Sequence, residues 1–403
     1  MRIALVTTYP PGMGSLNEYA FHFVKHLRQK PEVEAITLLV DELPPDEQYS
    51  KRTEAGADIS FDVCWRFEAL NNTRRIVEAV QRIKPDVVLF NIQFASFGSR
   101  RIPAALGLTA PMRIKRATDI PTFVLLHNIM ETVDLQSAGF AQNVLIRWIT
   151  EFFGAIFTRQ LLKADLVALT IPKYVEILQR KYKADNVLLA PHGAFDDAPP
   201  LHHTPAEHPF QVMTFGKFGT YKKVEPLIRA IEHLQQNGYP DLELVVAGSD
   251  SPNAPGYLAN VQTQYAHVPH IRFTGYVPEA AIPDLFTQAT VVVFPYESTT
   301  GSSGVLHQAG SYGRACVLPH IGDFKELVEE EGYKGEYFEA NNHLSLAAAI
   351  EHLLSDPAHR HLLEQQNYLA ANGLPMREVV DWYLLHIEQL LGSAYENRNP
   401  AKK

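Results

Sequence analysis

Short runs of apolar and β-branched residues alternate with longer stretches of helical periodicity along this 403-residue chain. In the first half, the pattern predicts strands over residues 3–7, 35–40, 86–90, 122–127, 166–169 and 187–190. In the second half, it predicts strands over residues 211–215, 243–247, 270–274, 291–294 and 315–319. Helices are expected between them, for example over residues 16–27, 73–83, 224–236 and 344–354. Such alternation is typical of an α/β fold with parallel sheets.

A segment without periodicity interrupts the pattern near the middle of the chain. Residues 196–209 read DDAPPLHHTPAEHP, a composition typical of a linker between domains. We therefore expect two Rossmann-like, doubly wound domains, over residues 1–195 and 210–375, which face each other across a cleft. A last helix is predicted over residues 376–395, packing back on the first domain, with a flexible tail over residues 396–403.

The composition narrows the class of protein and its compartment. The chain has 36 Lys and Arg against 45 Asp and Glu, and this net charge of −9 argues against a nucleic-acid partner. Its two cysteines, Cys64 and Cys316, are too few for a disulfide scaffold or a thiolate zinc cluster and indicate a reducing compartment. The sequence shows neither a signal peptide nor a long apolar span, so we expect a cytoplasmic protein.

A glycine turn follows the first predicted strand and precedes a helix. Gly12 and Gly14 fit the first two positions of a GxGxxG fingerprint, but the third position holds Asn17. Asp41 ends the second predicted strand, 29 residues after Gly12, whereas a ribose-binding acid is expected after about 20. An NAD-dependent oxidoreductase is thus one alternative, and a tight turn with a solvated acid is the other.

A basic loop opens the second half. Gly216 and Lys217 end its first strand, and Lys222 follows five residues later, before a helix. Ammonium groups at the carboxyl end of a parallel strand suit a diphosphate, because charge-assisted bonds to phosphate oxygens are strong. Solvated surface lysines are the alternative interpretation.

Small and hydroxyl residues follow the strand VVVF and lead into a helix. Backbone amides of such a segment converge on one point and, with the helix dipole, form a cradle for an anion. A hydroxyl-rich N-cap of a buried helix is the alternative. The residues of this segment are Thr300, Gly301, Ser302, Ser303, Gly304 and Val305.

His127 ends a predicted strand, at the edge of the first sheet where functional side chains gather. A contact to ligand and a structural role are both compatible with a single histidine. The sequence contains no HExxH, Walker, GxSxG or paired CxxC motif, so it gives no support for a metal site.

In their order along the chain, these features resemble the retaining glycosyltransferases of the GT-B fold, called glycosyltransferase group 1 or family 4, which include glycogen-synthase-like and mannosyltransferase enzymes. The segments that carry the resemblance are the Gly12 to Gly14 turn, His127, Gly216 to Lys222, FTGYV at 273–277 and GSSGVLHQ at 301–308. The resemblance implies a nucleotide-sugar donor, such as a UDP- or GDP-sugar, on the second domain and the acceptor on the first.

The resemblance also implies a role for individual residues. Lys217 and Lys222 would grip the diphosphate beside Gly216, and His127 would lie near the transferred sugar. The backbone of Tyr276 and Val277 would meet the base. The residues expected at phosphate are Gly14 from the first domain and Gly301, Ser302, Ser303, Gly304 and Val305 from the second.

The chain departs from the family at two acidic positions. Members usually carry two glutamates eight residues apart, and here the matching residues are Thr300 and Gln308. Gln308 retains hydrogen bonding to a ribose. Glu297, three residues upstream of Thr300, is the candidate to replace the missing acid at the sugar.

The function implied is transfer of a sugar to an acceptor hydroxyl in carbohydrate biosynthesis, with retention of anomeric configuration and without metal or cofactor. The acceptor would be a saccharide, a lipid-linked sugar or a small molecule. The aromatic segment 144–162, which carries arginines, would allow peripheral contact at the inner membrane face, with a core helix as its alternative. Rival functions are an NAD-dependent oxidoreductase, a nucleotide-sugar epimerase and a noncatalytic two-lobed nucleotide- or sugar-binding protein.

Overall fold

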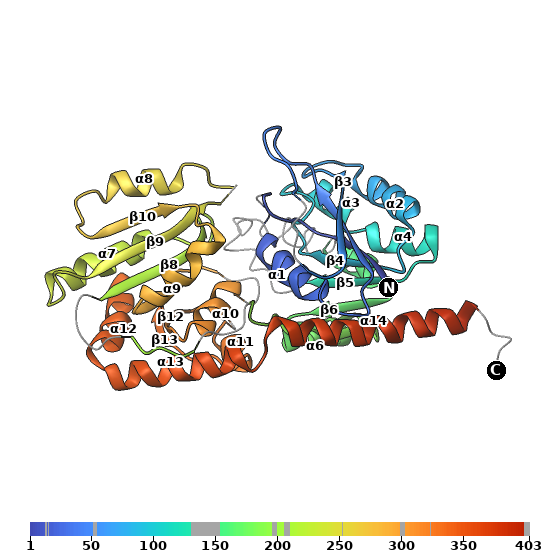
Figure 1. Cartoon of the computed structure of the whole chain (residues 1–403). Coiled ribbons are helices and arrows are strands. Elements are labelled where there is room, and N and C mark those ends of the chain that lie inside the picture. The colour runs from blue at the N-terminus through green and yellow to red at the C-terminus, as the bar shows by residue number, and fades with distance from the viewer. Residues whose placement is uncertain are drawn as a thin grey trace. The chain divides into compact units, whose positions relative to one another are not determined.

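The chain divides into two compact units, each with its own parallel sheet (Figure 1). Unit 1 contains Met1–His192 and Met376–Lys403, and unit 2 contains Gly193–Pro375. This computed structural model describes all residues except 13, 15, 51–54, 130–153, 196–199, 205–209, 252, 299–302, 323 and 399–403, and it describes only the backbone of 393–398. Most of the predicted linker therefore lies outside the described residues.

Unit 1 is built on a seven-stranded sheet of order β3-β2-β1-β4-β5-β6-β7, with every pair parallel. The strands are β1 (Arg2–Val6), β2 (Ala35–Asp41), β3 (Asp58–Trp65), β4 (Val87–Ile92), β5 (Thr122–Leu126), β6 (Leu166–Leu169) and β7 (Val187–Leu189). The helices are α1 (Asn17–Leu27), α2 (Asn72–Ile83), α3 (Arg101–Gly107), α4 (Ala110–Thr118), α6 (Pro172–Tyr182) and α14 (Met376–Arg398). Central strands such as β4 are buried along their whole length, as expected between two helical layers.

Unit 2 repeats the architecture with a six-stranded parallel sheet of order β10-β9-β8-β11-β12-β13. Its strands are β8 (Gln211–Phe218), β9 (Glu243–Asp250), β10 (Ile271–Gly275), β11 (Val291–Val293), β12 (Ala315–His320) and β13 (Glu336–Glu339). Its helices are α7 (Glu225–Gln236), α8 (Tyr257–Gln264), α9 (Ile282–Gln288), α10 (Gly304–Ser311), α11 (Phe324–Glu330), α12 (His343–Ser355) and α13 (Pro357–Asn372). Apolar side chains from both sheet faces pack against these helices and form two core clusters. The predicted class, α/β with two parallel-sheet domains, is confirmed.

The predicted helix at the C-terminus exists and belongs to unit 1. Tyr383 of α14 is buried, with its ring 5.1 Å from Phe23 of α1 and 5.2 Å from Phe123 of β5. Lys30 and Asp381 add an ion pair between the end of the α1 region and α14. The final helix is therefore a part of the unit 1 core. Among the described residues, no helix has the length and apolarity needed to cross a bilayer.

Candidate functional site

The candidate site of unit 2 lies where its strand order reverses. β8 lies between β9 and β11, so the connections after β8 and after β11 leave the sheet in opposite directions. Such a switch point, at the carboxyl edge of a parallel sheet, is where open α/β folds bind ligands. The two loops that follow these strands are the basic loop and the small-residue segment singled out in the sequence.

Backbone contacts hold these two loops together. Lys222 and Tyr296 form an isolated antiparallel bridge. The Glu297 amide donates to the Tyr221 carbonyl at 2.8 Å, and the Lys223 amide donates to the Pro295 carbonyl at 3.0 Å. The structure thus brings Lys222 beside the segment that leads into α10, although about 80 residues of sequence separate them.

Lys222 has an unusual environment for a lysine. Its side chain is buried, with only 9% of the residue exposed. The ammonium lies 4.7 Å from the ring centroid of Tyr296 and 5.8 Å from that of Tyr221. Within the described part of the chain, no carboxylate lies in ion-pair range of Lys222. Aromatic faces offset part of the cost of burying this charge, and an anion would complete its pairing.

Two glycines on neighbouring strands make room for this ammonium. Gly216 has φ +136° and Gly248 has φ +133°, a backbone region that favours glycine, and the two are register partners on β8 and β9. A Cβ atom at position 216 would lie 2.8 Å from Lys222 Nζ, and one at position 248 would collide with the Gly216 carbonyl. Position 216 therefore requires glycine, because a side chain there would occupy the space of the Lys222 ammonium.

The other lysines of the loop differ from Lys222. Lys217 lies on the last part of β8 and is half-buried. Lys223 Nζ donates to the Gly219 carbonyl at 2.9 Å and lies over the Tyr257 ring, so this side chain fastens the loop. Within the described residues, Lys222 is therefore the candidate cation of this loop for an anion, and the role expected of Lys217 remains a prediction.

The start of α10 supplies backbone donors, and its N-cap residue contacts Tyr296. Ser303, the N-cap residue, has extended φ and ψ of −106° and 110°, and its hydroxyl lies 3.2 Å from the Tyr296 hydroxyl. The Ser303 carbonyl accepts from the amides of Leu306 and His307. The amides of Gly304 and Val305, at the first two helical positions, have no acceptor within the helix. Thr300, Gly301 and Ser302 lie outside the described residues.

The remaining donor-side predictions lie on the same unit. Gln308 is buried on α10. Glu297 is exposed beside the loop, and loss of hydration together with Glu225 raises the pKa of its carboxyl against the opposing effect of Lys223. Tyr276 follows β10 and is 74% exposed, as a platform for a base would be, while Val277 packs against the core. Their roles remain predictions.

Unit 1 carries a separate polar chain at its own switch point, between β1 and β4. Asn91 of β4 donates to Thr7 Oγ1 at 3.0 Å, and its Oδ1 lies 2.6 Å from His127 Nε2. Because the Asn91 amide nitrogen donates to Thr7, its oxygen accepts, so Nε2 of His127 carries the proton and Nδ1 is an acceptor. Burial lowers the pKa of His127 to about 3, so the imidazole is neutral near pH 7. The rings of Tyr19 and His192 lie beside it.

Gly14 and Asp41, which suggested a dinucleotide enzyme, both pack against or bond to neighbouring residues of unit 1. A Cβ atom at Gly14 would collide with the Thr8 side chain, so close packing of the chain on itself requires this glycine. The Asp41 carboxylate accepts a hydrogen bond of 3.0 Å from the Tyr49 hydroxyl, and burial raises its pKa. Asp41 is thus already engaged, which weakens the case for a ribose-binding role. The expected contact of Gly14 with phosphate remains a prediction.

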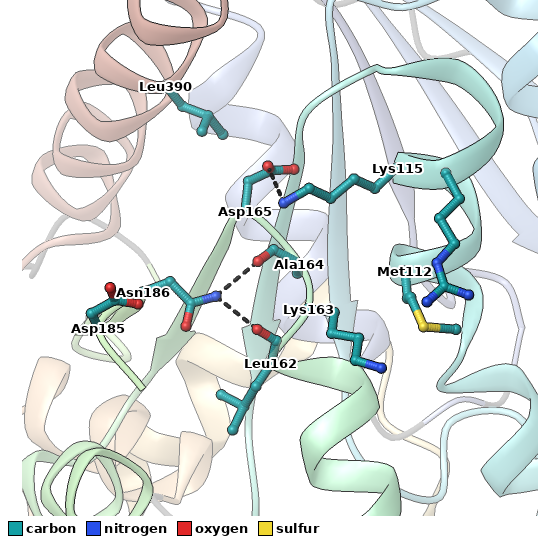
Figure 2. A pocket seen from close by; sticks show the side chains of 10 residues that line it. Met112, Lys115, Leu162, Lys163, Ala164, Asp165, Asp185, Asn186 and Leu390 are labelled. Carbon is teal, nitrogen blue, oxygen red and sulfur yellow. Dashed lines mark hydrogen bonds and ion pairs between the residues drawn. The ribbon is translucent and has the colours of Figure 1, made fainter. Parts of the chain in front are cut away.

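A pocket of about 560 Å³ lies at the opposite, amino-terminal edge of the unit 1 sheet. Figure 2 shows Lys115, Asp165 and Asn186 of this pocket in contact with neighbouring groups. Lys115 Nζ pairs with Asp165 Oδ1 at 2.8 Å, and the Asn186 amide donates to the carbonyls of Leu162 and Ala164. These contacts fasten the strand starts to α4 and to the preceding loop, so we assign them a structural role.

Sequence reasoning missed the groups that prepare these sites. Tyr221 and Tyr296 lie beside the Lys222 ammonium, and Asn91 sets the tautomer of His127. Tyr221 directly precedes Lys222, a signal that was available in the sequence. Asn91 interrupts an otherwise apolar buried strand, which is a second signal of a polar requirement.

Comparison with protein families and curated proteins shows similarity to glycosyltransferases. Residues 209–356 match the family of glycosyl transferases group 1. A phosphatidyl-myo-inositol mannosyltransferase of Propionibacterium freudenreichii subsp. shermanii is 25% identical over 262 residues, which cover 63% of this chain. The match spans 61% of that relative's length, less than two thirds.

Solved structures of low sequence identity share the whole fold. Sucrose-phosphate synthase from Thermosynechococcus elongatus has a TM-score of 0.75 at 18% identity, covering 98% of this chain and all of that one. Anabaena HepE, solved with UDP-glucose, has a TM-score of 0.67 at 16% identity, with 98% and 100% covered. The expected resemblance is thereby confirmed: residues 209–356 match the glycosyltransferase group 1 family, and the whole chain has the two-domain GT-B glycosyltransferase fold.

Proposed function

We propose that the protein is a glycosyltransferase that moves a sugar from a nucleoside diphosphate to an acceptor hydroxyl. The observation that carries this proposal is the buried Lys222 ammonium, which lies 4.7 Å from the ring centroid of Tyr296 at the switch point of unit 2. The Tyr296 hydroxyl in turn lies 3.2 Å from that of Ser303, the N-cap residue of α10. The match of residues 209–356 to glycosyl transferases group 1 includes these residues. The mannosyltransferase relative supports sugar transfer, and the HepE structure with UDP-glucose supports a uridine nucleotide as donor, with GDP as the alternative.

The proposed chemistry depends on stabilising a leaving group. As the bond between the sugar and phosphate breaks, negative charge grows on the diphosphate. Lys217, Lys222 and the amides of Gly304 and Val305 would interact more strongly with that charge than with the intact donor. Because these donors are fixed before the reaction, little reorganisation is needed. We therefore propose departure of the nucleotide without a metal ion.

We propose retention of anomeric configuration by attack on the same face as the departing phosphate. The positions that match the family glutamates hold Thr300 and Gln308, so neither offers a carboxylate nucleophile. The leaving phosphate would accept the proton of the acceptor hydroxyl. His127, neutral and with Nδ1 as an acceptor, suits a hydrogen bond from a sugar hydroxyl.

The acceptor and the place of action belong to the proposal as well. The mannosyltransferase relative is named for a phosphatidyl-myo-inositol acceptor, which supports a lipid-linked acceptor over a free saccharide or small molecule. Cytoplasmic location and contact of segment 144–162 with the inner membrane face stay predictions, because most of that segment lies outside the described residues. Sedimentation with anionic and neutral liposomes tests this contact, and failure to pellet with either would contradict it.

A donor screen tests the function. The protein is incubated with UDP- and GDP-sugars, with and without sugar and lipid-linked acceptors, and the products are separated and identified. Release of nucleoside diphosphate together with a new glycoside of the donor's anomeric configuration is expected. An inverted product would refute retention, and an epimerised donor without a glycoside would indicate an epimerase. Thermal stabilisation by NAD but by no nucleoside diphosphate would favour the oxidoreductase. Nucleotide binding without turnover would favour a noncatalytic binding protein.

A further inference from the structure

Two histidines and a glutamate meet at the amino-terminal edge of the unit 2 sheet. Glu336 is the first residue of β13, His352 lies in the last turn of α12 and His359 in the first turn of α13. None of the three belongs to the nucleotide site proposed above, which lies at the carboxyl edge of the same sheet. Because the three residues are separated in the sequence, they do not form a short sequence motif.

The geometry points all three side chains at one place. Glu336 Oε1 lies 2.7 Å from His359 Nε2, and Oε2 lies 3.2 Å from His352 Nδ1. The two imidazole rings are stacked, with centroids 4.9 Å apart and planes inclined by 22°. One ligand atom from each residue lies within 4.8 Å of the other two.

The turn between the two helices fixes the histidines. Asp356 follows α12 and caps α13, and its Oδ1 accepts from the His359 amide at 2.9 Å. A carboxylate and two imidazole rings therefore face one another on a surface that solvent reaches.

We propose that Glu336, His352 and His359 bind a divalent transition metal ion of the Zn²⁺ class. Imidazole and carboxylate are established zinc ligands, and two histidines with one carboxylate leave positions for water. Tetrahedral zinc with bonds of about 2.0 to 2.1 Å places ligand atoms roughly 3.3 Å apart. The three ligand atoms now lie within 4.8 Å of one another, so a tetrahedral ion would require the partly exposed side chains to rotate inward.

A second cluster of the same residue types provides a contrast. Glu364 is fully buried, and its carboxylate accepts hydrogen bonds from Thr204 and lies 2.7 Å from His203 Nδ1. Nε2 of His361 lies 3.1 Å from the Thr204 carbonyl. The buried Arg360, with Nε 3.8 Å from Glu364 Oε1, already pairs with this carboxylate, whereas the part of the chain that the structure describes places no Lys or Arg in ion-pair range of Glu336. This cluster therefore supplies a matched control.

Titration of the full chain with ZnCl₂ tests the site. We expect one Zn²⁺ to bind with about micromolar affinity or tighter and to raise the unfolding temperature of unit 2. His352→Gln and His359→Gln should each weaken binding at least about tenfold, since each removes a ligand. His361→Gln should leave zinc affinity unchanged. Absence of binding by the wild type, or unchanged affinity in both of the first two variants, would overturn the proposal.

Two further measurements need no variant. Bound Co²⁺ should give visible absorption bands without a thiolate charge-transfer band, and such a band would place the metal on a cysteine and overturn the site. Zn²⁺ should protect His352 and His359 of the wild type from diethyl pyrocarbonate, as read by mass spectrometry. The exposed His233 should react equally with and without zinc. Equal modification of all three would contradict the proposal.

Discussion

A lysine ammonium buried beside two tyrosine rings is costly unless something compensates for the water it loses. At Lys222, cation–π contacts with Tyr221 and Tyr296 supply part of that compensation. The absent Cβ at Gly216 leaves space directly at Nζ. A phosphate oxygen at this position would gain a charge-assisted hydrogen bond from a group whose orientation is already fixed.

Replacing Lys222 by alanine should weaken binding of UDP or GDP roughly tenfold to a hundredfold, because a hydrogen bond to a charged group is worth about 1.5 to 3 kcal/mol. Isothermal titration measures the change. Lys334→Ala is the control, since Lys334 lies on the same unit and pairs with Glu329 at 3.8 Å. Equal affinity of wild type and the Lys222 variant would remove this residue from the site.

Gly216→Ala tests the space around the ammonium. The new methyl group meets Lys222 Nζ, and the positive φ adds strain of about 1 to 3 kcal/mol. We expect both lower stability and weaker nucleotide binding. Gly238→Ala is the matched control, because Gly238 has φ +118° with nothing within 4 Å of an added Cβ. Gly238→Ala should lower the stability of the protein and leave its nucleotide affinity unchanged. Equal nucleotide affinity in the two variants would contradict the packing argument.

His127 should make the protein sensitive to acid. Its folded-state pKa of about 3 lies below the unfolded value of about 6.5, so the unfolded chain binds the extra proton. The associated stability is present above pH 6.5 and is lost as the pH falls toward 3. Between pH 7 and 5, wild type should lose about 1 to 2 kcal/mol more than His127→Gln in urea unfolding. His233→Gln, at an exposed position, should behave as wild type; identical pH slopes for all three would refute the assignment.

At the scale of elements, the start of α10 combines the helix dipole with backbone amides that have no acceptor within the helix. The extended conformation of Ser303 is the one that a following proline requires, and proline is well tolerated at the first helical position. This position therefore allows one backbone donor to be removed while the helix is kept.

Gly304→Pro should weaken nucleotide diphosphate binding roughly tenfold, because it deletes the Gly304 N–H without breaking α10. Gly304→Ala keeps the amide and is the control. Titration of both variants, with circular dichroism to verify the fold, measures the effect. Should the proline variant bind as tightly as the alanine variant, this amide makes no contact with the ligand.

The pattern of apolar runs predicts the central strands of both sheets, because these are buried on both faces and read as continuous hydrophobic segments. It misses β3 and β13, which lie at the sheet edges. β3 begins with alternating exposed and half-buried residues and is buried only at Cys64 and Trp65, and β13 has four residues with a glutamate at each end. It also ends β8 and β9 three residues early, at 215 and 247, because Gly216 and Gly248 read as turn residues.

The candidate site is only partly predictable for a related reason. The sequence indicates Lys222 and the Ser303 to Val305 segment separately, since each follows a strand. Their pairing depends on β8 and β11 being neighbours, which is a property of strand order and not of local pattern. The same holds at the amino-terminal edge of the unit 2 sheet. Glu336, His352 and His359 are brought together only by the topology of β13, α12 and α13.

At the scale of the whole molecule, the chain returns to its first unit after completing the second. α14 closes the core of unit 1 through Tyr383, which is buried against α1 and β5. The stability of unit 1 therefore depends on residues that lie beyond unit 2 in the sequence.

Tyr383→Ala should destabilise unit 1 by about 3 to 5 kcal/mol, since it leaves a large cavity in the core. Denaturant unfolding followed by hydrogen exchange of each unit measures this loss. Leu385→Ala, on the same helix and 52% exposed, should change stability little. Nucleotide binding by unit 2 should persist in both variants. Equal stability of the two variants would contradict the role given to α14.

The crystal structure of the protein soaked with UDP and with GDP tests the central claim most directly. A diphosphate oxygen should lie about 3 Å from Lys222 Nζ, and another should accept from the amides of Gly304 or Val305. A nucleotide bound elsewhere, or one bound here with its phosphates turned away from Lys222, would contradict the proposed site.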